Sequence, residues 1–66
     1  MQIIVNGSCL EVGSGFTLLA LLDHIGKPSA HVAVEHNGEV LERSCFADVR
    51  LGDKDRLEIV HFVGGG

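Results

Sequence analysis

The sequence predicts a small α+β domain in which one helix packs on one face of a mixed sheet of four or five strands. Three observations predict this class: short apolar or alternating segments typical of strands, two Asn-Gly dipeptides typical of tight hairpins, and one stretch of leucines at helical spacing. The segments run in the order two strands, one helix, then two or three strands. A sheet of this order has one face under the helix and one face open, which is an α+β roll.

The chain is expected to open with a hairpin. Met1 to Val5 is rich in apolar residues, and Asn6-Gly7 follows as a signal for a type I′ turn. The second strand is expected over about Ser8 to Val12. It ends at Gly13-Ser14-Gly15, a flexible turn without the lysine of a phosphate-binding loop.

One short helix is expected next, with Thr17 as its N-cap and Phe16 as a hydrophobic staple. Gly26 is placed to end it in a left-handed conformation, and Pro28 is expected to prevent it from resuming. Its apolar stripe follows positions i, i+3, i+4 and i+7, and consists of Leu18, Leu21, Leu22 and Ile25. We interpret this stripe as core rather than as a partner-binding surface.

A second hairpin follows the helix. Residues 31–35 alternate as a strand does, and Asn37-Gly38 supplies another turn before Val40 and Leu41. Val49 and Leu51 then suggest a further short strand ahead of the charged turn 52–56.

The last strand carries the candidate docking residues. Alternation from Leu57 onward sends Leu57 and Ile59, with His61 in the same register, toward the helix. Val60 and Phe62 then lie on the open face, where exposed apolar area would suit a partner protein. Cover by loops is the alternative, and a register slip of one residue would exchange the two faces.

The apolar run is followed by Gly64, Gly65 and Gly66. Glycine has no Cβ, so a glycine tail can thread a channel too narrow for other residues and carry a carboxylate to a distant site. We therefore expect a domain over residues 1–63 and a flexible tail over residues 64–66, with the carboxylate of Gly66 as the candidate reactive group. The alternative is a loose chain end without a role.

Composition excludes several classes of partner. A length of 66 residues suits one small domain, and a hydrophobic content of 45% is enough for a core. The net charge of -4 disfavours nucleic acid and favours a basic protein partner. No apolar run is long enough to span a membrane, and the start of the chain lacks the features of an export signal, so we expect a cytoplasmic protein.

No set of residues is arranged for catalysis or metal binding. Cys9 and Cys45 are far apart and form no Cys-x-x-Cys pair, so we expect reduced cysteines that serve in packing. The histidines are scattered without ligand spacing, and His61 is distinguished only by its place near the tail. There is no serine elbow or His-Cys pair, so any ATP chemistry must come from a partner.

The chain resembles the ThiS family of thiamine-biosynthesis sulfur carriers over its whole length. The resemblance rests on the strand-strand-helix order, the helix start Thr17-Leu18-x-x-Leu21-Leu22, the turn Gly52-Asp53 and the ending Glu58 to Gly66. Gly65 and Gly66 match the terminal glycine pair of the family, and Gly64 adds a third glycine. The fold that the resemblance implies is the ubiquitin-like β-grasp.

The resemblance further implies a sulfur carrier and co-substrate rather than an enzyme, with no cofactor of its own and a monomeric free state. A ThiF-like adenylyltransferase would use MgATP to adenylate the carboxylate of Gly66. A sulfur donor protein would displace AMP, and the resulting thiocarboxylate would deliver sulfur to a ThiG-like thiazole synthase. Val60 and Phe62 would serve as docking residues.

Three alternatives remain open from the sequence. The first is another sulfur carrier of the same fold, such as the small subunit of molybdopterin synthase or a carrier for thiolation of transfer RNA. The second is a ubiquitin-like modifier, whose Gly66 would end in an isopeptide bond to lysine. The third is a passive interaction module, for which deletion of Gly65 and Gly66 would leave activity intact.

Overall fold

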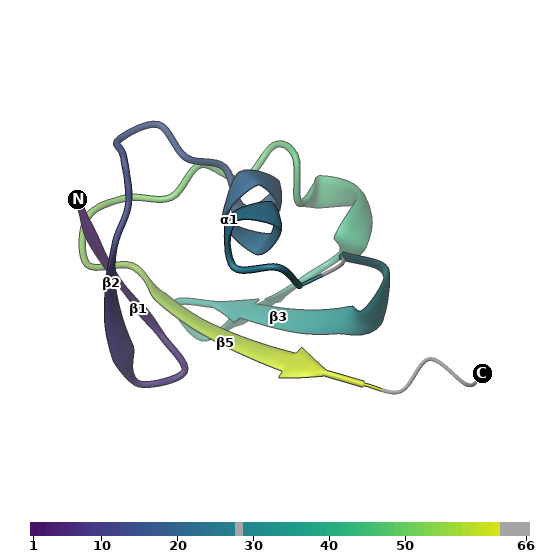
Figure 1. The fold of residues 1–66 in the computed structure, drawn as a ribbon. Helices are drawn as coiled ribbons and strands as arrows, with labels where there is room; N and C mark the ends of the chain where they lie inside the picture. Colours follow the sequence, from purple (N-terminus) through teal and green to yellow (C-terminus); the bar gives the residue numbers. More distant parts are fainter. Residues whose placement is uncertain (28, 63–66) are drawn as a thin grey trace.

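The computed structural model describes residues 1–27 and 29–62. Within them, helix α1 (Leu18–His24) lies over one face of the sheet, as Figure 1 shows. Two 3₁₀ turns, η1 (Ser29–His31) and η2 (Arg43–Cys45), lie in the connections. The strands are β1 (Gln2–Val5), β2 (Ser8–Glu11), β3 (Val32–His36), β4 (Glu39–Leu41) and β5 (Arg56–His61).

The strands form one mixed sheet in the order β2-β1-β5-β3-β4. β5 pairs parallel with β1 and antiparallel with β3, and the two hairpins β1-β2 and β3-β4 are antiparallel. The last strand of the chain is therefore the central strand of the sheet. This arrangement, with one helix across one face, is the ubiquitin-like β-grasp, so the expected fold is confirmed.

Both Asn-Gly dipeptides form the predicted tight turns. Asn6 and Gly7 have φ angles of 50° and 84°, and Asn37 and Gly38 have φ angles of 50° and 87°. Positive φ at both central positions is the requirement of a type I′ turn, whose twist matches that of the flanking strands. The turns set the hairpin registers, for example Val5 opposite Ser8.

Helix α1 begins and ends as the sequence predicts. The hydroxyl of Thr17 accepts a hydrogen bond of 3.1 Å from the backbone N–H of Ala20. At the other end Gly26 adopts φ 75°, and the N–H groups of Gly26 and Lys27 donate to the carbonyls of Asp23 and Leu22. These two bonds are those of a Schellman motif. Pro28, expected to prevent the helix from resuming, lies outside the described residues.

The core lies between α1 and the inner face of the sheet. The leucine stripe supplies three fully buried residues, while Ile25 and Phe16 are partly buried against the core. The ring of Phe16 also meets that of His24 edge-on, with ring centroids 5.8 Å apart. The buried residues are Ile3, Val12, Leu18, Leu21, Leu22, Val32, Val34, Phe46, Leu51, Leu57 and Ile59. None of the helices in the described ranges is long and apolar enough to cross a membrane.

The prediction of a short strand around Val49 and Leu51 is wrong. This segment forms a single isolated bridge, between Arg50 and Thr17. The N–H of Leu18 donates to the carbonyl of Val49, and the N–H of Leu51 donates to the carbonyl of Phe16. The segment thus pairs with the residues at the start of α1 instead of with the sheet. Leu51 is buried in the core, and Val49 packs against it.

The prediction that the two cysteines serve in packing is also wrong, because both are exposed and free. Cys9 lies on the edge strand β2 opposite Ile4, whose neighbour Ile3 points into the core. Alternation therefore places Cys9 on the open face. Cys45 ends the exposed 3₁₀ turn η2.

Candidate functional site

The candidate site is the end of β5, the strand that leads into the glycine-rich residues. β5 is bonded on both sides. It pairs with β1 through two residue pairs, Ile4 with Arg56 and Val5 with Leu57, and with β3 over five residue pairs. After the strand, the N–H of Phe62 still donates to the carbonyl of His31 at 2.9 Å. The chain is thus held in the sheet as far as Phe62.

Asn6 extends the pairing of β1 with β5 beyond the end of β1. Its backbone N–H donates to the carbonyl of Leu57 at 2.9 Å. Its side-chain amide then acts as a further peptide group: Nδ2 donates to the carbonyl of Ile59 at 3.0 Å, and Oδ1 accepts from the N–H of Ile59 at 2.7 Å. The turn residue therefore holds β5 next to Val60.

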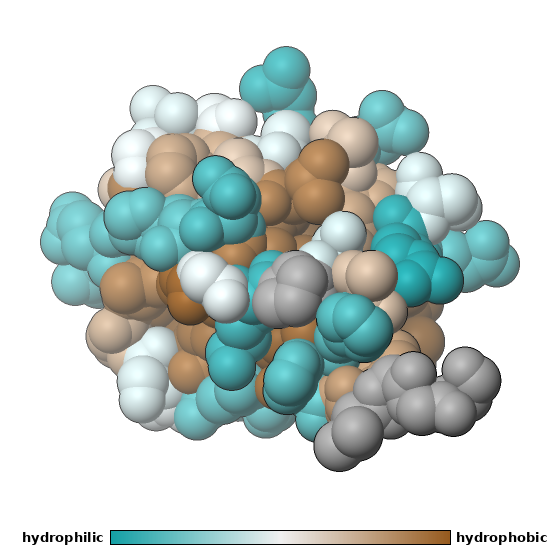
Figure 2. All heavy atoms as spheres, turned by 45° about the vertical axis from the view of Figure 1, so that its right-hand side comes forward, coloured by the Kyte–Doolittle hydropathy of each residue, from teal (hydrophilic) through white to brown (hydrophobic). Residues whose placement is uncertain are grey.

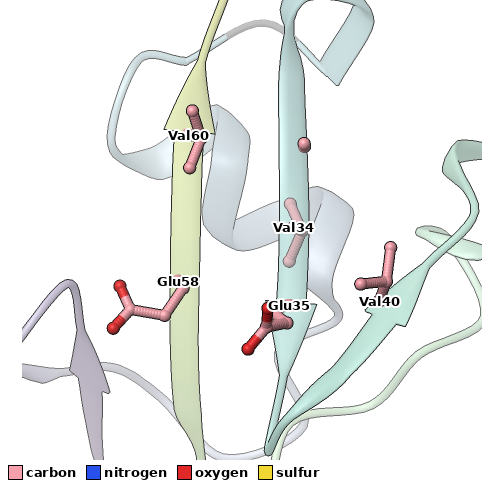
Figure 3. Close-up of a pocket in the computed structure, with 6 residues that line it drawn as sticks. Val34, Glu35, Val40, Glu58 and Val60 are labelled. Carbon is pink, nitrogen blue, oxygen red and sulfur yellow. The ribbon is translucent and has the colours of Figure 1, made fainter.

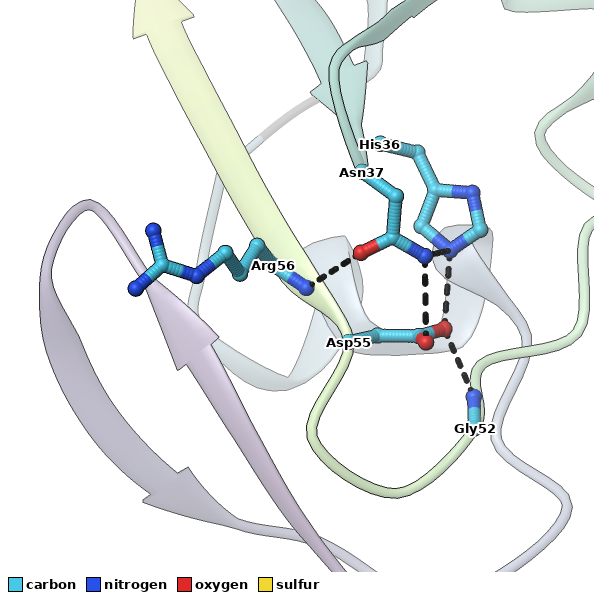
Figure 4. Close-up of polar contacts among 5 residues, drawn as sticks. All are labelled: His36, Asn37, Gly52, Asp55 and Arg56. Atoms are coloured by element: carbon cyan, nitrogen blue, oxygen red, sulfur yellow. Dashed lines mark hydrogen bonds and ion pairs between the residues drawn. The ribbon is translucent and has the colours of Figure 1, made fainter.

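Asn37 has the matching role on the other side of β5, at the start of the strand. Its Oδ1 accepts from the N–H of Arg56 at 2.8 Å, and its own N–H donates to the carbonyl of Arg56 at 2.8 Å. Figure 4 shows this amide between Arg56 and the carboxylate of Asp55. Both Asn-Gly turns thus hold the central strand through their side chains as well as shaping hairpins.

Asp55 is the centre of a polar cluster at the start of β5 (Figure 4). Its carboxylate accepts from the N–H of Gly52 at 2.7 Å, from His36 Nε2 at 2.8 Å and from Asn37 Nδ2 at 3.2 Å. Burial acts to raise the pKa of Asp55, but these hydrogen bonds together outweigh it and hold the pKa below the ordinary value of 3.8. The cluster ties the turn 52–55 to the second hairpin, and it supports the start of β5 rather than its end.

The end of β5 and the residue after it carry exposed apolar side chains. Val60 is 61% exposed on the face away from α1, and Phe62 just beyond β5 is 44% exposed. Ile59 and Leu57 point inward, so the predicted alternation is confirmed for these strand residues. His61 is exposed despite its register toward the helix side, and its ring meets His31 edge-on. The docking role of Val60 and Phe62 stays a prediction.

A shallow hollow lies between β5, β3 and β4 on this face (Figure 3). Val60 and Val40 flank it, and Val40 is the most exposed of the large apolar residues described, at 74%. Its lining is formed by Ala33, Val34, Glu35, Val40, Glu58 and Val60. The end of the molecule that β5 approaches shows apolar side chains among hydrophilic ones (Figure 2).

Sequence reasoning missed Val40 and the acidic pair Glu35 and Glu58. The signal was present in the second Asn-Gly turn, because a two-residue hairpin places Glu35 opposite Val40. What no local pattern supplies is the pairing of β3 with β5, which brings Ala33 opposite Val60 and Glu35 opposite Glu58.

The tail residues Gly64, Gly65 and Gly66, and Val63 before them, lie outside the described residues. Their expected role, with Gly66 as the modified residue, therefore stays a prediction. Among the described residues no group of three or more His, Cys, Asp or Glu side chains could hold a metal ion.

Comparison with known proteins agrees with the geometry. The ThiS family model matches residues 2–66. The crystal structure of the thiamine biosynthesis protein ThiS from Geobacter metallireducens superposes with a TM-score of 0.85 and 36% sequence identity, covering 100% of both chains. The match includes the whole sheet and the helix.

Two curated relatives add functional context. The thiazole synthase of Paramagnetospirillum magneticum is 42% identical over 66 residues, which is 100% of this chain but 20% of that protein. The chain thus spans about a fifth of the length of that relative. The sulfur carrier protein ThiS of Bacillus subtilis is 51% identical over 35 residues, which is 53% of each chain.

Proposed function

Because the chain belongs to the ThiS family, we propose that it is a sulfur carrier protein for the thiazole step of thiamine biosynthesis. The carboxylate of Gly66 carries the sulfur, and the protein acts as a co-substrate rather than as an enzyme. The observation that supports this most strongly is the position of β5, which is the central strand and is followed in the sequence by Phe62, Val63 and the three glycines. The sheet holds the chain as far as Phe62, next to the exposed side chain of Val60.

The chemistry begins with activation, because a carboxylate is a poor acyl donor whose charge repels nucleophiles. A ThiF-like adenylyltransferase uses MgATP, so that an oxygen of the Gly66 carboxylate attacks the α-phosphorus and pyrophosphate leaves. Sulfide then attacks the acyl carbon and AMP leaves, which gives the thiocarboxylate. A persulfide donor would give an acyl disulfide first, which a second thiol must reduce.

The length of the tail sets how far this group can reach. Four residues follow Phe62 in the sequence. At about 3.3–3.6 Å per extended residue they span at most about 14 Å. Each partner must therefore bring its reactive centre within that distance of Phe62. The last three of the four residues are glycines, which have no Cβ and suit a narrow channel.

The proposed acceptor is a ThiG-like thiazole synthase. Its support is the thiazole synthase of Paramagnetospirillum magneticum, one region of which is similar to the whole of this chain. A carrier region within a synthase places donor and acceptor at high effective concentration. We propose that the two act here as partners, and that Val60 and Phe62 contribute to docking.

The test is mass spectrometry of the untagged protein after incubation with the adenylyltransferase, MgATP and a sulfur donor. Exchange of oxygen for sulfur adds about 16 Da, as oxidation of Met1 or a cysteine does, so fragmentation must place the change on Gly66. A variant extended by one alanine after Gly66 is the matched control, since it keeps the fold and moves the carboxylate. An unmodified Gly66, with the enzyme active on another carrier, would refute the proposal. A lysine conjugate on a denaturing gel would instead indicate a ubiquitin-like modifier.

A further inference from the structure

We propose that the open face binds thiazole synthase through an arginine of that enzyme. The aliphatic stem of the arginine lies in the hollow between Val40 and Val60, and its guanidinium pairs with the carboxylates of Glu35 and Glu58. This rests on the proposed function, because it names the contact through which the carrier recognises its acceptor.

The hollow has the shape and polarity for such a side chain. It lies across three strands, with the methyl groups of Val40 and Val60 on either side and Ala33 between them. The two valines are 74% and 61% exposed, so their apolar surface is unused by the core. An arginine stem buries apolar surface of this kind while its charged head stays at the rim.

Glu35 and Glu58 supply the charge. They are directly opposite each other on β3 and β5. Like charges at directly opposite positions destabilise a sheet. Neither forms an ion pair with any residue in the described ranges, where His36 with Asp55 is the one pair found. Figure 3 shows the carboxylate of Glu58 turned away from β3, the strand that bears Glu35. The two charges are held on neighbouring strands, and the side chain of Glu58 must rotate toward β3 for one cation from outside to bond to both carboxylates.

Arginine suits this arrangement better than other cations. Its planar guanidinium offers five donors and can bond to two carboxylates at once, whereas the lysine ammonium is a compact point charge with a strong hydration shell. A metal ion would use the carboxylates but would leave the valines without a partner. The combination of two acidic groups and an apolar hollow therefore favours arginine.

The choice of thiazole synthase follows from position and from the relatives. Val60 lies two residues before Phe62, where the last described bond to the sheet is made, so a protein on this face is next to the start of the tail. The tail reaches at most about 14 Å from there. A thiazole synthase that contains a similar region brings both partners into one chain.

The first experiment measures binding of the purified carrier to purified thiazole synthase by titration calorimetry. The double variant Glu35→Gln with Glu58→Gln is compared with Glu39→Gln with Glu42→Gln. Glu39 and Glu42 are exposed outside the hollow, and Glu42 makes no side-chain cap bond, so both double variants remove the same charge. We expect the first to raise Kd at least about tenfold and the control to change it less than about twofold. Equal effects of the two would overturn the proposal.

A second readout needs no partner. Removing the like-charge pair should raise the thermal midpoint of the free carrier by about 2–4 °C in Glu58→Gln, relative to Glu39→Gln. An unchanged or lower midpoint would contradict the argument that repulsion between Glu58 and Glu35 destabilises the free carrier.

A third readout identifies the cation. Phenylglyoxal modifies arginine, and acetylation with acetic anhydride modifies lysine, so mass spectrometry can locate which side chain of thiazole synthase the carrier protects. We expect one arginine to be protected by the wild-type carrier and not by a saturating amount of Glu35→Gln with Glu58→Gln. Protection of a lysine alone would overturn the assignment. Thiocarboxylate formation on Gly66 is assayed separately, so failure of this contact and failure of the carrier function are distinguished.

Discussion

Asn6 offers a sharp test of how β5 is held in the sheet, because its side chain bonds to the backbone of that strand. Asn6→Ala removes the two hydrogen bonds that the side-chain amide makes with Ile59, at 2.7 Å and 3.0 Å. Each is worth about 1 kcal/mol net. The substitution also leaves an alanine at φ 50°, a left-handed position that adds about 1 kcal/mol of strain. We therefore expect Asn6→Ala to lower the free energy of unfolding by about 3 kcal/mol.

The control for Asn6→Ala is Asn6→Gly, which loses the same hydrogen bonds but tolerates the positive φ. We expect a loss of about 2 kcal/mol for it in urea unfolding at equilibrium. Hydrogen exchange gives the local evidence, because the N–H of Ile59 loses its acceptor in both variants. If that amide exchanged at the wild-type rate relative to global unfolding, the proposed side-chain pairing would be refuted.

Three further predictions concern the cluster, the helix and the open face. The free energy of unfolding should be higher for wild type than for Asp55→Asn, and this difference should be complete above about pH 5. It should shrink as the pH falls through the lowered pKa of Asp55, which lies below 3.8. A difference that does not change with pH in urea unfolding would contradict this. Gly26→Ala should lower the free energy of unfolding by about 1 kcal/mol through its φ of 75°, since within the described ranges no residue beyond the adjacent chain comes within 4 Å of the added Cβ. A neutral result in the same assay would count against the cap geometry. Val60→Asn, which removes apolar surface without adding charge, should weaken binding to thiazole synthase at least about tenfold, while Leu19→Asn on the exposed side of α1 should not. Equal effects in calorimetry would remove Val60 from the docking surface.

Local chemistry explains what could be predicted from the sequence. The Asn-Gly turns, the Thr17 cap and the Gly26 ending all depend on residues within one or two turns of chain, and each formed as expected. The burial of Leu57 and Ile59 followed from period-two alternation once β5 was recognised. These signals are strong because the residue type itself restricts the backbone.

Long-range pairing explains what could not be predicted. Val49 and Leu51 are apolar at strand spacing, but the entry to α1 takes up their backbone groups. Cys9 is a different case, because its register follows from the local Asn6-Gly7 turn and its exposure depends on which face of the sheet α1 covers. The opposition of Glu35 and Glu58 arises only when β3 pairs with β5. Such contacts join segments about twenty residues or more apart, where single-residue preferences carry little information.

The most direct test of the carrier function follows sulfur itself. Thiazole synthase is supplied with the carrier, the adenylyltransferase, MgATP, the carbon substrates and a donor labelled with ³⁴S, and the label is measured in the thiazole product. We predict labelled thiazole with the wild-type carrier in multiple-turnover reactions, and none with a variant lacking Gly65 and Gly66 whose thermal midpoint is unchanged. Equal labelling by that variant, or by reactions without the carrier, would contradict a role for the Gly66 carboxylate in sulfur transfer.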